Sequence, residues 1–222
     1  MPTQLRRLAN VVYPLYSPIV HRIFKSDLYH HWGSPPNLTW LGNPICQDPL
    51  TLWTLSETIS KLRPKLIIET GTNCGGSALF YAHLLDLLNI EDARVITVDV
   101  DKLHSLDHPR ITWLIGSSTS DVIVKEMRAS TEAAAGPVIV ILDSNHTTKH
   151  VATEMELYHR FVTPGSLLHV QDGGTDHWGR PLGPLRAIID FLPAHPEFVV
   201  DEELASQFLI TRHPMGWLRR RA

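Results

Sequence analysis

The chain has 222 residues, of which 43% are hydrophobic and 19% are charged, so it can bury a core and is not compositionally disordered. Its 20 Lys and Arg and 23 Asp and Glu give a formal net charge of −3, which leaves no basic surplus for binding nucleic acid. No uninterrupted apolar run approaches the roughly 18–20 residues of a membrane span. From the charge and from the apolar runs, respectively, neither a nucleic acid nor a membrane is an expected partner.

The N-terminal segment, residues 1–47, has no steady hydrophobic period and is rich in proline, tyrosine and tryptophan. We expect an extension of short helices and loops lying over the main domain, with aromatic side chains that pack on it or form a lid or dimer contact. Its apolar surface favours a homo-oligomer, most simply a dimer. Two cysteines, Cys46 and Cys74, are too few for a disulfide framework, and no signal-peptide cleavage site is evident, which favours reduced thiols in a cytoplasmic protein.

The main domain, residues 48–222, begins with a helix signal. Asp48 is a good N-cap, and Pro49 stands at the first helical position, where its missing N–H costs nothing. Leucine and isoleucine follow at helical spacing up to Leu62, and Pro64 ends the predicted helix.

Strands and helices then alternate along the chain. Strands rich in Val, Ile and Leu are predicted at Lys65–Thr70, Arg94–Val100, Ile111–Gly116, Val138–Asp143 and Ser166–Asp172. Helices are predicted at Ala78–Leu88, Ser120–Ala135, Thr148–Val162 and Pro184–Leu192. Continuous apolar strands that alternate with helices indicate an α/β domain with a parallel sheet covered on both faces.

The C-terminal part has a different pattern. Phe198–Leu204 and Phe208–His213 are predicted strands, separated by a turn too short for a helical crossover, so they have to pair antiparallel. Five parallel strands followed by an antiparallel hairpin are typical of the Rossmann-like sheet of class I S-adenosylmethionine-dependent methyltransferases, and they are unusual among dinucleotide-binding folds.

The loop after the first predicted strand is glycine-rich and stands where open α/β sheets bind ligands. A triphosphate-binding loop needs a lysine where Ser77 stands, and a dinucleotide-binding loop needs a glycine where Asn73 stands. S-adenosylmethionine has no phosphate, so an acid at the strand end and small residues in the loop suffice, although such a loop alone does not exclude other ligands. The candidate cofactor contacts here are Glu69, Gly71, Asn73, Gly75 and Ser77.

Two further strand ends add candidate nucleoside contacts. Asp99 ends the second strand, where a carboxylate can accept hydrogen bonds from ribose hydroxyls, a device that dehydrogenases also use. Ser117 and Ser118 follow the third strand and can border the adenine, although ordinary turn and capping roles explain these serines equally well.

Acidic and amide side chains end the fourth and fifth predicted strands. Asp143 ends one of them, and Gln171 and Asp172 end the other. Adjacent parallel strands lie about 4.8 Å apart, so these side chains can converge on one cation. A set of oxygen ligands favours Mg²⁺ over Zn²⁺. The alternative is that the acids cap helices or contact a ligand without a metal.

Histidines near this edge of the sheet complete the candidate site. His146 lies three residues after Asp143, where a neutral imidazole can take a proton from an acceptor hydroxyl, or can serve only as a loop or capping residue. Structural roles are expected for His150 and His169. The glycine-rich segment Gly173–Pro184 either closes over an acceptor or forms a loop whose tryptophan packs on the body. Its candidate acceptor contacts are His177, Trp178 and Arg180.

More specific motifs accompany these residues. They are Gln47-Asp48-Pro49, Ile68-Glu69-Thr70-Gly71, Asp143-Ser144-Asn145-His146, Val162-Thr163-Pro164-Gly165-Ser166 and Pro214-Met215-Gly216-Trp217-Leu218. Together they resemble the cephalosporin hydroxylase/rhamnosyl O-methyltransferase family over roughly Asn43 to Leu218. The resemblance implies the methyltransferase fold, with S-adenosylmethionine and Mg²⁺ as cofactors. Family members carry an acidic pair where Gln171-Asp172 stands, so this chain departs from the pattern at Gln171.

The expected activity is transfer of a methyl group from S-adenosylmethionine to a hydroxyl of a sugar or short oligosaccharide. Similarity to the sugar methyltransferases of mycobacteria implies a small carbohydrate acceptor, a mannoside in particular. Asp143, a candidate cofactor contact as well, is expected to hold Mg²⁺ with Gln171 and Asp172, while His146 takes the acceptor's proton. Two alternatives stay open: a metal-independent O-methyltransferase, and a catalytically inactive S-adenosylmethionine-binding partner subunit.

Overall fold

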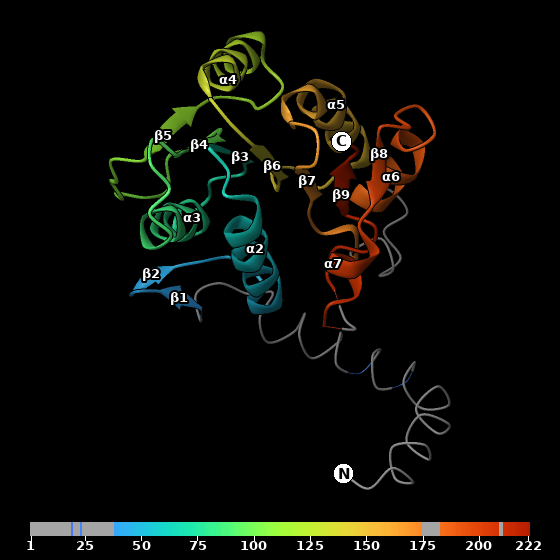
Figure 1. Ribbon diagram of the computed structural model, residues 1–222, viewed down its shortest axis with the longest axis horizontal. Helices are drawn as coiled ribbons and strands as arrows, with labels where there is room; N and C mark the ends of the chain where they lie inside the picture. The colour runs from blue at the N-terminus through green and yellow to red at the C-terminus, as the bar shows by residue number, and fades with distance from the viewer. Residues whose placement is uncertain (1–18, 20–22, 24–37, 175–182, 209–210) are drawn as a thin grey trace, which may run out of the picture.

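The computed structural model describes residues 38–174, 183–208 and 211–222, together with Ile19 and Ile23 (Figure 1). Most of the expected N-terminal extension lies outside the described residues, so its boundary at residue 47 and the homo-oligomer both stay predictions. The candidate acceptor contacts His177, Trp178 and Arg180 also lie outside the described part of the chain.

A seven-stranded sheet forms the centre of the described part, in the order β5-β4-β3-β6-β7-β9-β8. Its strands are β3 (Leu66–Thr70), β4 (Arg94–Asp99), β5 (Ile111–Ile115), β6 (Val138–Leu142), β7 (Leu167–Val170), β8 (Phe198–Val200) and β9 (Trp217–Arg220). Strands β3 to β7 pair parallel, whereas β9 pairs antiparallel with both β7 and β8. A separate antiparallel pair, β1 (Thr39–Trp40) and β2 (Asn43–Pro44), packs beside helix α3 (Gly76–Leu87).

Helices cover both faces of the sheet. They are α2 (Pro49–Leu62), α3 (Gly76–Leu87), α4 (Asp121–Ala133), α5 (Thr148–Tyr158), α6 (Pro184–Phe191) and α7 (Glu202–Ser206), with a 3₁₀ turn η1 (His159–Phe161) after α5. Figure 1 shows α4, α5 and α6 on one face and α2, α3 and α7 on the other. Successive strand residues supply the two cores in turn: Ile68 packs under α4 and α5, and Ile67 packs against α2 and α3. This explains why the strands read as continuous apolar runs.

The predicted start of α2 is confirmed. The Asp48 carboxylate accepts a hydrogen bond from the Leu50 backbone N–H at 3.1 Å, and Pro49 is the first helical residue. At the other end, Arg63 adopts a left-handed conformation with φ 47°, and its N–H bonds back to the Ile59 carbonyl at 2.9 Å.

The predicted C-terminal hairpin is correct in its antiparallel pairing and wrong in its second strand. After β8, Asp201 caps the short helix α7 by accepting a hydrogen bond from the Leu204 N–H at 3.1 Å. The described residues of Phe208–His213 form turn and loop, and the last strand is β9. The physical reason is burial, because Trp217 and Leu218 are 1% and 0% exposed whereas Phe208 is exposed.

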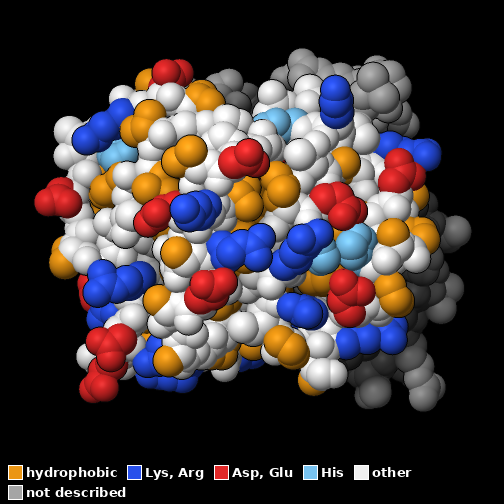
Figure 2. Space-filling view, turned by 90° about the horizontal axis from the view of Figure 1, so that it is seen from above, with side chains coloured by type: hydrophobic (Ala, Val, Ile, Leu, Met, Phe, Trp, Pro, Cys, Tyr) orange, Lys and Arg blue, Asp and Glu red, His pale blue; other side chains and the backbone are white. Residues whose placement is uncertain are grey.

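On the face that Figure 2 shows, positive and negative side chains are mixed. Lys and Arg side chains lie among Asp and Glu side chains and apolar atoms there. Among the described helices, none is both long enough and apolar enough to cross a membrane.

His169 of β7 is a core residue, as expected. It is 0% exposed, its ring stacks on Trp217 with centroids 3.8 Å apart, and its Nδ1–H donates to the Gly216 carbonyl at 3.2 Å. Burial lowers the pKa of His169 to about 3, against the opposing effect of that hydrogen bond.

We expect the protein to lose stability as the pH falls below 6.5. The imidazole of His169 titrates near pH 6.5 in the unfolded chain and near pH 3 in the folded one, so protons bind the unfolded state preferentially between these values. The stability from the neutral ring is complete above pH 6.5, and about 2 kcal/mol of it is lost between pH 7 and pH 5. Urea unfolding at the two pH values measures this loss.

The control is His169→Phe, which keeps an aromatic ring against Trp217 and removes the titration. The variant should show a shallower pH dependence, but not a flat one, because burial also lowers the pKa of His213 well below its ordinary value. An identical dependence in both proteins would show that His169 does not carry the effect.

Candidate active site

A cavity of about 800 Å³ opens at the carboxyl ends of the parallel strands. Its wall is formed by the glycine loop after β3 and by the ends of β4, β5 and β6. Residues before α2, such as Gln47, and Arg212 near the C-terminus complete it. The predicted site residues on this wall are Gly71, Asn73, Ser77, Asp99, Ser117, Ser118, Asp143, His146 and Asp172. The volume lies within the range of small-molecule sites, so the structure brings most of the predicted residues to one pocket.

The glycine loop can pass close to β6 because Gly71 has no side chain. Gly71 has φ +90°, and a Cβ there would collide with the backbone carbonyl of Asp143. Its N–H donates to the Val98 carbonyl at 2.9 Å, which ties the loop to β4. Gly75, with φ +77°, is the N-cap of α3 and lies off the cavity wall. The loop is therefore held between two strands by contacts that only glycine permits at residue 71.

Asp99 connects the glycine loop to the end of β4. Its Oδ2 accepts a hydrogen bond from the Asn73 N–H at 2.8 Å, and its Oδ1 accepts from the Val100 N–H at 2.7 Å. Each carboxylate oxygen can accept a second hydrogen bond, and Asp99 lines the cavity, so a ligand hydroxyl can still be bound there.

Glu69 lies beneath the loop and not on the wall. It is 1% exposed, and its Oε2 accepts a hydrogen bond from the Thr97 hydroxyl at 2.6 Å, which in turn lies 2.7 Å from the Thr72 hydroxyl. Burial raises the pKa of Glu69 to about 8, although hydrogen bonds from Ser77 and Thr97 oppose the shift. In this arrangement the carboxyl is largely protonated at neutral pH and braces the loop from below.

Asp143 and Asp172 converge at one end of the cavity, with His146 between them. His146 Nε2 lies 3.2 Å from Asp143 Oδ1, and its Nδ1 lies 3.6 Å from Asp172 Oδ2. One ligand atom from each of the three residues lies within 4.8 Å of the others. The predicted convergence of the fourth and fifth strand ends is thus present in the structure.

Burial and mutual charge govern the protonation of this group. Burial raises the pKa of Asp143 to about 6, the charge of Asp172 acts in the same direction, and the hydrogen bond to His146 opposes them. For His146, burial lowers the pKa, but the hydrogen bond to Asp143 and the negative charges of Asp143 and Asp172 outweigh it, so its pKa is raised. Two partly buried carboxylates this close favour positive charge beside them, which Arg212 supplies in part.

The turn that presents Asp172 is held by the C-terminal segment. Asp172 has φ +57°, and its N–H donates to His213 Nδ1 at 2.7 Å. Because Nδ1 accepts this bond, the ring proton of His213 is on Nε2, which lies 2.9 Å from the Thr51 hydroxyl. The guanidinium of Arg212 pairs with the Asp172 carboxylate at 3.3 Å. The sequence analysis missed both roles because it assigned these residues to a strand.

Gln171, the third predicted metal ligand, is not brought to the wall. Its side chain is 3% exposed, and its Nε2 is buried without a hydrogen-bond partner among the described residues. Both residues follow the end of β7 at Val170, and the backbone turns at Asp172, which has a left-handed φ of +57°, so only Asp172 lines the cavity. The arrangement supports two of the three predicted ligands and does not support Gln171 as the third.

Gln47 and His150 are wall residues that the sequence analysis did not assign to the site. Gln47 Nε2 donates to Asp143 Oδ2 at 2.7 Å. His150, which was expected to be structural, has its Nε2 at 3.1 Å from the Ser144 hydroxyl and 3.2 Å from the Ser118 hydroxyl. Buried Glu154 accepts from Ser144 at 2.7 Å and completes this network. A signal for both was present, since they lie in or beside the motifs around Asp48 and Asp143.

The two cysteines lie next to each other on the cavity wall. Cys46 Sγ and Cys74 Sγ are 3.6 Å apart, and both residues are free thiols that line the cavity. The distance is far longer than a disulfide bond, in agreement with the expected reduced thiols.

Solved structures with similar folds are methyltransferases. A structure of CmcI with Mg and SAM matches with a TM-score of 0.68 and 23% identity, over 87% of this chain and 84% of that chain. MycE from the mycinamycin biosynthetic pathway, in complex with Mg, SAH and mycinamycin VI, matches with a TM-score of 0.51 and 20% identity, over 78% of this chain and 46% of that chain. These likenesses confirm the expected class I S-adenosylmethionine-dependent methyltransferase fold.

Sequence comparison identifies the family. The rhamnosyl O-methyltransferase of Mycobacterium tuberculosis is 30% identical over 212 residues, which cover 88% of this chain and 84% of that protein. The profile of the rhamnosyl O-methyltransferase/CmcI family matches residues 34–221, nearly the whole chain. The family expected from the motifs is confirmed, and the chain belongs to the rhamnosyl O-methyltransferase/CmcI family.

Proposed function

We propose that this protein transfers the methyl group of S-adenosylmethionine to a hydroxyl group of a small carbohydrate, with Mg²⁺ held by Asp143 and Asp172. Membership of an O-methyltransferase family supports the reaction class. The observation that carries the proposal is the convergence of these two carboxylates with His146 within 4.8 Å at one end of the cavity.

The cavity fits the proposed methyl donor. Gly71 leaves backbone exposed in the loop, and Asp99 and the serines after β5 supply polar groups for a nucleoside along the wall. The carboxylates of Asp143 and Asp172 line the same cavity. No phosphate-binding lysine stands in the loop, which agrees with a cofactor that has no phosphate.

The carboxylate pair fits a hard divalent cation. Carboxylate oxygens are preferred ligands of Mg²⁺. The Arg212 guanidinium, 3.3 Å from Asp172, offsets part of their negative charge. The raised pKa of Asp143, caused by burial and then by Asp172, is the mark of a pair that a cation would stabilise. Bound Mg²⁺ would supply positive charge that lowers the pKa of a nearby acceptor hydroxyl.

His146 is the proposed base. Its Nε2 is hydrogen-bonded to Asp143, so Nδ1, with its longer contact of 3.6 Å to Asp172, is the nitrogen that accepts the hydroxyl proton. The oxygen then attacks the methyl carbon in line as the carbon–sulfur bond breaks, and S-adenosylhomocysteine leaves. Asp143 orients the imidazole and stabilises its positive charge. Most of the remaining acceleration comes from holding the oxygen about 3–3.5 Å from the methyl carbon.

The acceptor is the part of the proposal that depends most on relatives. The curated relatives are named for a rhamnosyl acceptor, and a mannoside is proposed only from the resemblance to the sugar methyltransferases of mycobacteria. Two other hypotheses compete: a metal-independent methyltransferase in which the acids only orient the acceptor, and a catalytically inactive partner subunit that binds S-adenosylmethionine.

The deciding experiment is a methyl-transfer assay over mannosides, rhamnosides and other small glycosides, with products detected by mass spectrometry. We expect a methylated sugar that requires Mg²⁺ and disappears with a chelator. Unchanged turnover after chelation would favour the metal-independent enzyme. Calorimetry that shows tight cofactor binding while no acceptor is methylated would favour the inactive subunit.

We expect His146→Ala to lower kcat by about 10²–10⁴-fold and to leave cofactor affinity almost unchanged, because the ring moves a proton and does not hold the adenosine. Steady-state kinetics and calorimetry measure the two effects. The matched control is His108→Ala, since His108 pairs with Asp86 at 3.2 Å near the end of α3 and does not line the cavity. Full activity of His146→Ala would assign the base elsewhere.

A further inference from the structure

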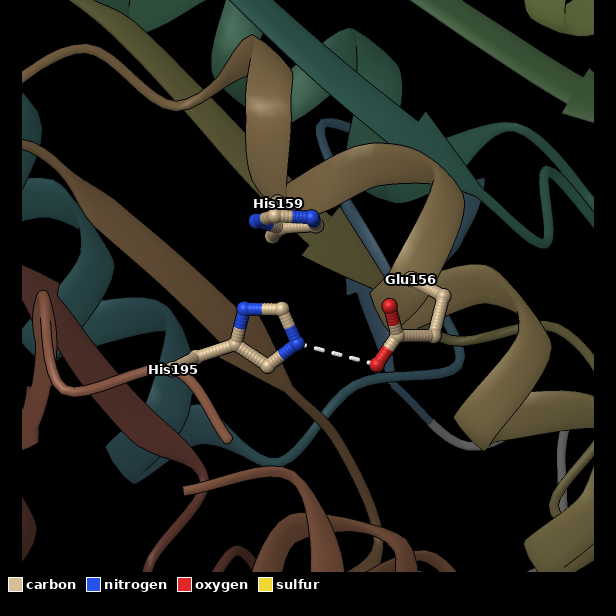
Figure 3. A group of neighbouring side chains, drawn as sticks. All are labelled: Glu156, His159 and His195. Carbon is tan, nitrogen blue, oxygen red and sulfur yellow. Dashed lines mark hydrogen bonds and ion pairs between the residues drawn. The ribbon is translucent and has the colours of Figure 1, made fainter. Parts of the chain in front are cut away.

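A second group of titratable side chains lies at the far end of α5. Glu156 comes from α5, His159 from η1, and His195 from the turn after α6 (Figure 3). Glu156 follows the first residue of α5, Thr148, by eight residues, which corresponds to about 12 Å along the helix axis. These three residues do not line the active-site cavity.

The ligand atoms of this group converge. One nitrogen of each histidine and one carboxylate oxygen of Glu156 lie within 4.8 Å of one another. His195 Nε2 lies 2.9 Å from Glu156 Oε1, and its Nδ1 lies 3.3 Å from Glu197 Oε1. Figure 3 shows a nitrogen of each imidazole on the side that faces the Glu156 carboxylate.

The contacts of His195 require a cation. A neutral imidazole has one N–H to donate, yet both nitrogens of His195 face carboxylate oxygens, which only accept hydrogen bonds. Either a proton or a metal ion has to occupy the position between one ring nitrogen and its carboxylate.

His159 distinguishes the two cations. Its Nδ1 lies 3.7 Å from Glu197 Oε1, while its Nε2 is buried and has no hydrogen-bond partner among the described residues. A proton on His195 would leave this nitrogen without a partner, whereas a metal ion bound at Nε2 would satisfy it.

We propose that Glu156, His159 and His195 form a binding site for a divalent transition-metal cation, Zn²⁺ above all, with Glu197 orienting the two imidazoles. Two imidazoles and a carboxylate form a ligand set typical of Zn²⁺ and differ from the oxygen ligands near Asp143. A carboxylate on the far nitrogen of a ligating histidine is a common device for fixing its tautomer, and Glu197 Oε1 lies within 3.7 Å of Nδ1 of both rings.

Only small movements are needed to form the site. Tetrahedral Zn²⁺ with bonds of about 2.0–2.1 Å sets its ligands about 3.3 Å apart. The ring of His159 is held by Phe191 and Phe198, with centroids 5.7 Å and 6.2 Å away, whereas the exposed Glu156 side chain can adjust. The bound ion would join the end of α5 to the turn between α6 and β8, so its expected role is to stabilise the fold.

The test measures Zn²⁺ binding to the purified full chain. Because Zn²⁺ also competes for the active-site acids, the titration uses the Asp143→Asn background, with a chromophoric chelator as competitor. We expect one Zn²⁺ per chain, a rise in the melting temperature, and an intense visible absorption when Co²⁺ replaces Zn²⁺ in four-fold coordination. The competing chelator sets the lowest Zn²⁺ concentration at which binding can be detected. If no Zn²⁺ is bound at 100 times that concentration, the proposal is overturned.

Two further variants in the same background identify the ligands. His159→Asn and Glu156→Gln should each weaken Zn²⁺ binding at least 10-fold, and the exposed Glu156 keeps the test valid if the histidine variant does not fold. The control is Glu126→Gln on α4, which should bind Zn²⁺ as the background does. Equal binding by Glu156→Gln and the control would place the ion elsewhere.

Discussion

Asp143→Ala is expected to lower turnover about 10³-fold, because this carboxylate both orients the proposed base and holds the proposed cation. Two contacts converge on this carboxylate, since Gln47 donates to Oδ2 at 2.7 Å and His146 lies 3.2 Å from Oδ1, and Asp172 would share the proposed cation. Alanine removes the orientation of the base and half of the charge that holds Mg²⁺. Single-turnover kinetics, together with Mg²⁺ titration, measure the loss.

The control for charge alone is Asp121→Ala, at an exposed position in the first turn of α4, which should leave turnover within about two-fold of the parent. Asp143→Asn removes the charge with little change in volume, and its single amide oxygen can accept only one of the two hydrogen bonds that the carboxylate accepts. If Asp143→Ala retained full turnover and full Mg²⁺ dependence, the cation would have to be held without this strand end.

Gly71→Ala is expected to destabilise the fold by about 3 kcal/mol or more and to abolish cofactor binding. The new Cβ would collide with the backbone of Asp143 at a φ of +90°, where side chains other than glycine are strained. Neither partner is a flexible side-chain end, so the loop or the end of β6 has to move. Urea unfolding and calorimetry with S-adenosylmethionine measure the two losses.

Gly165→Ala is the matched control. Gly165 has a φ of +79°, close to that of Gly71, but a Cβ there would meet no atom within 4 Å. Its cost should be that of the backbone conformation alone, about 1 kcal/mol. Equal losses in the two variants would show that conformation, and not the contact with Asp143, determines the effect at Gly71.

Local signals in the sequence were sufficient for most of the fold. Helices bury both faces of the parallel strands, so each strand is a continuous apolar run in the sequence. These runs, separated by segments with helical spacing of apolar residues, predicted the five parallel strands. The cap at Asp48 was readable because a capping bond spans two residues. The last strand was not, since the pattern at Phe208–His213 and the actual strand at Trp217–Arg220 differ mainly in which side chains the other elements bury.

The sequence by itself determined the strand-end positions of Asp99, Asp143 and Asp172, because the carboxyl ends of parallel strands share one edge of the sheet. Only the tertiary structure decided which side chains complete the pocket. Gln47 reaches Asp143 across 96 positions, and His213 holds the Asp172 turn across 41. The directions of Glu69 and Gln171, which lie off the cavity wall, depend on packing between strands and helices that no local pattern encodes.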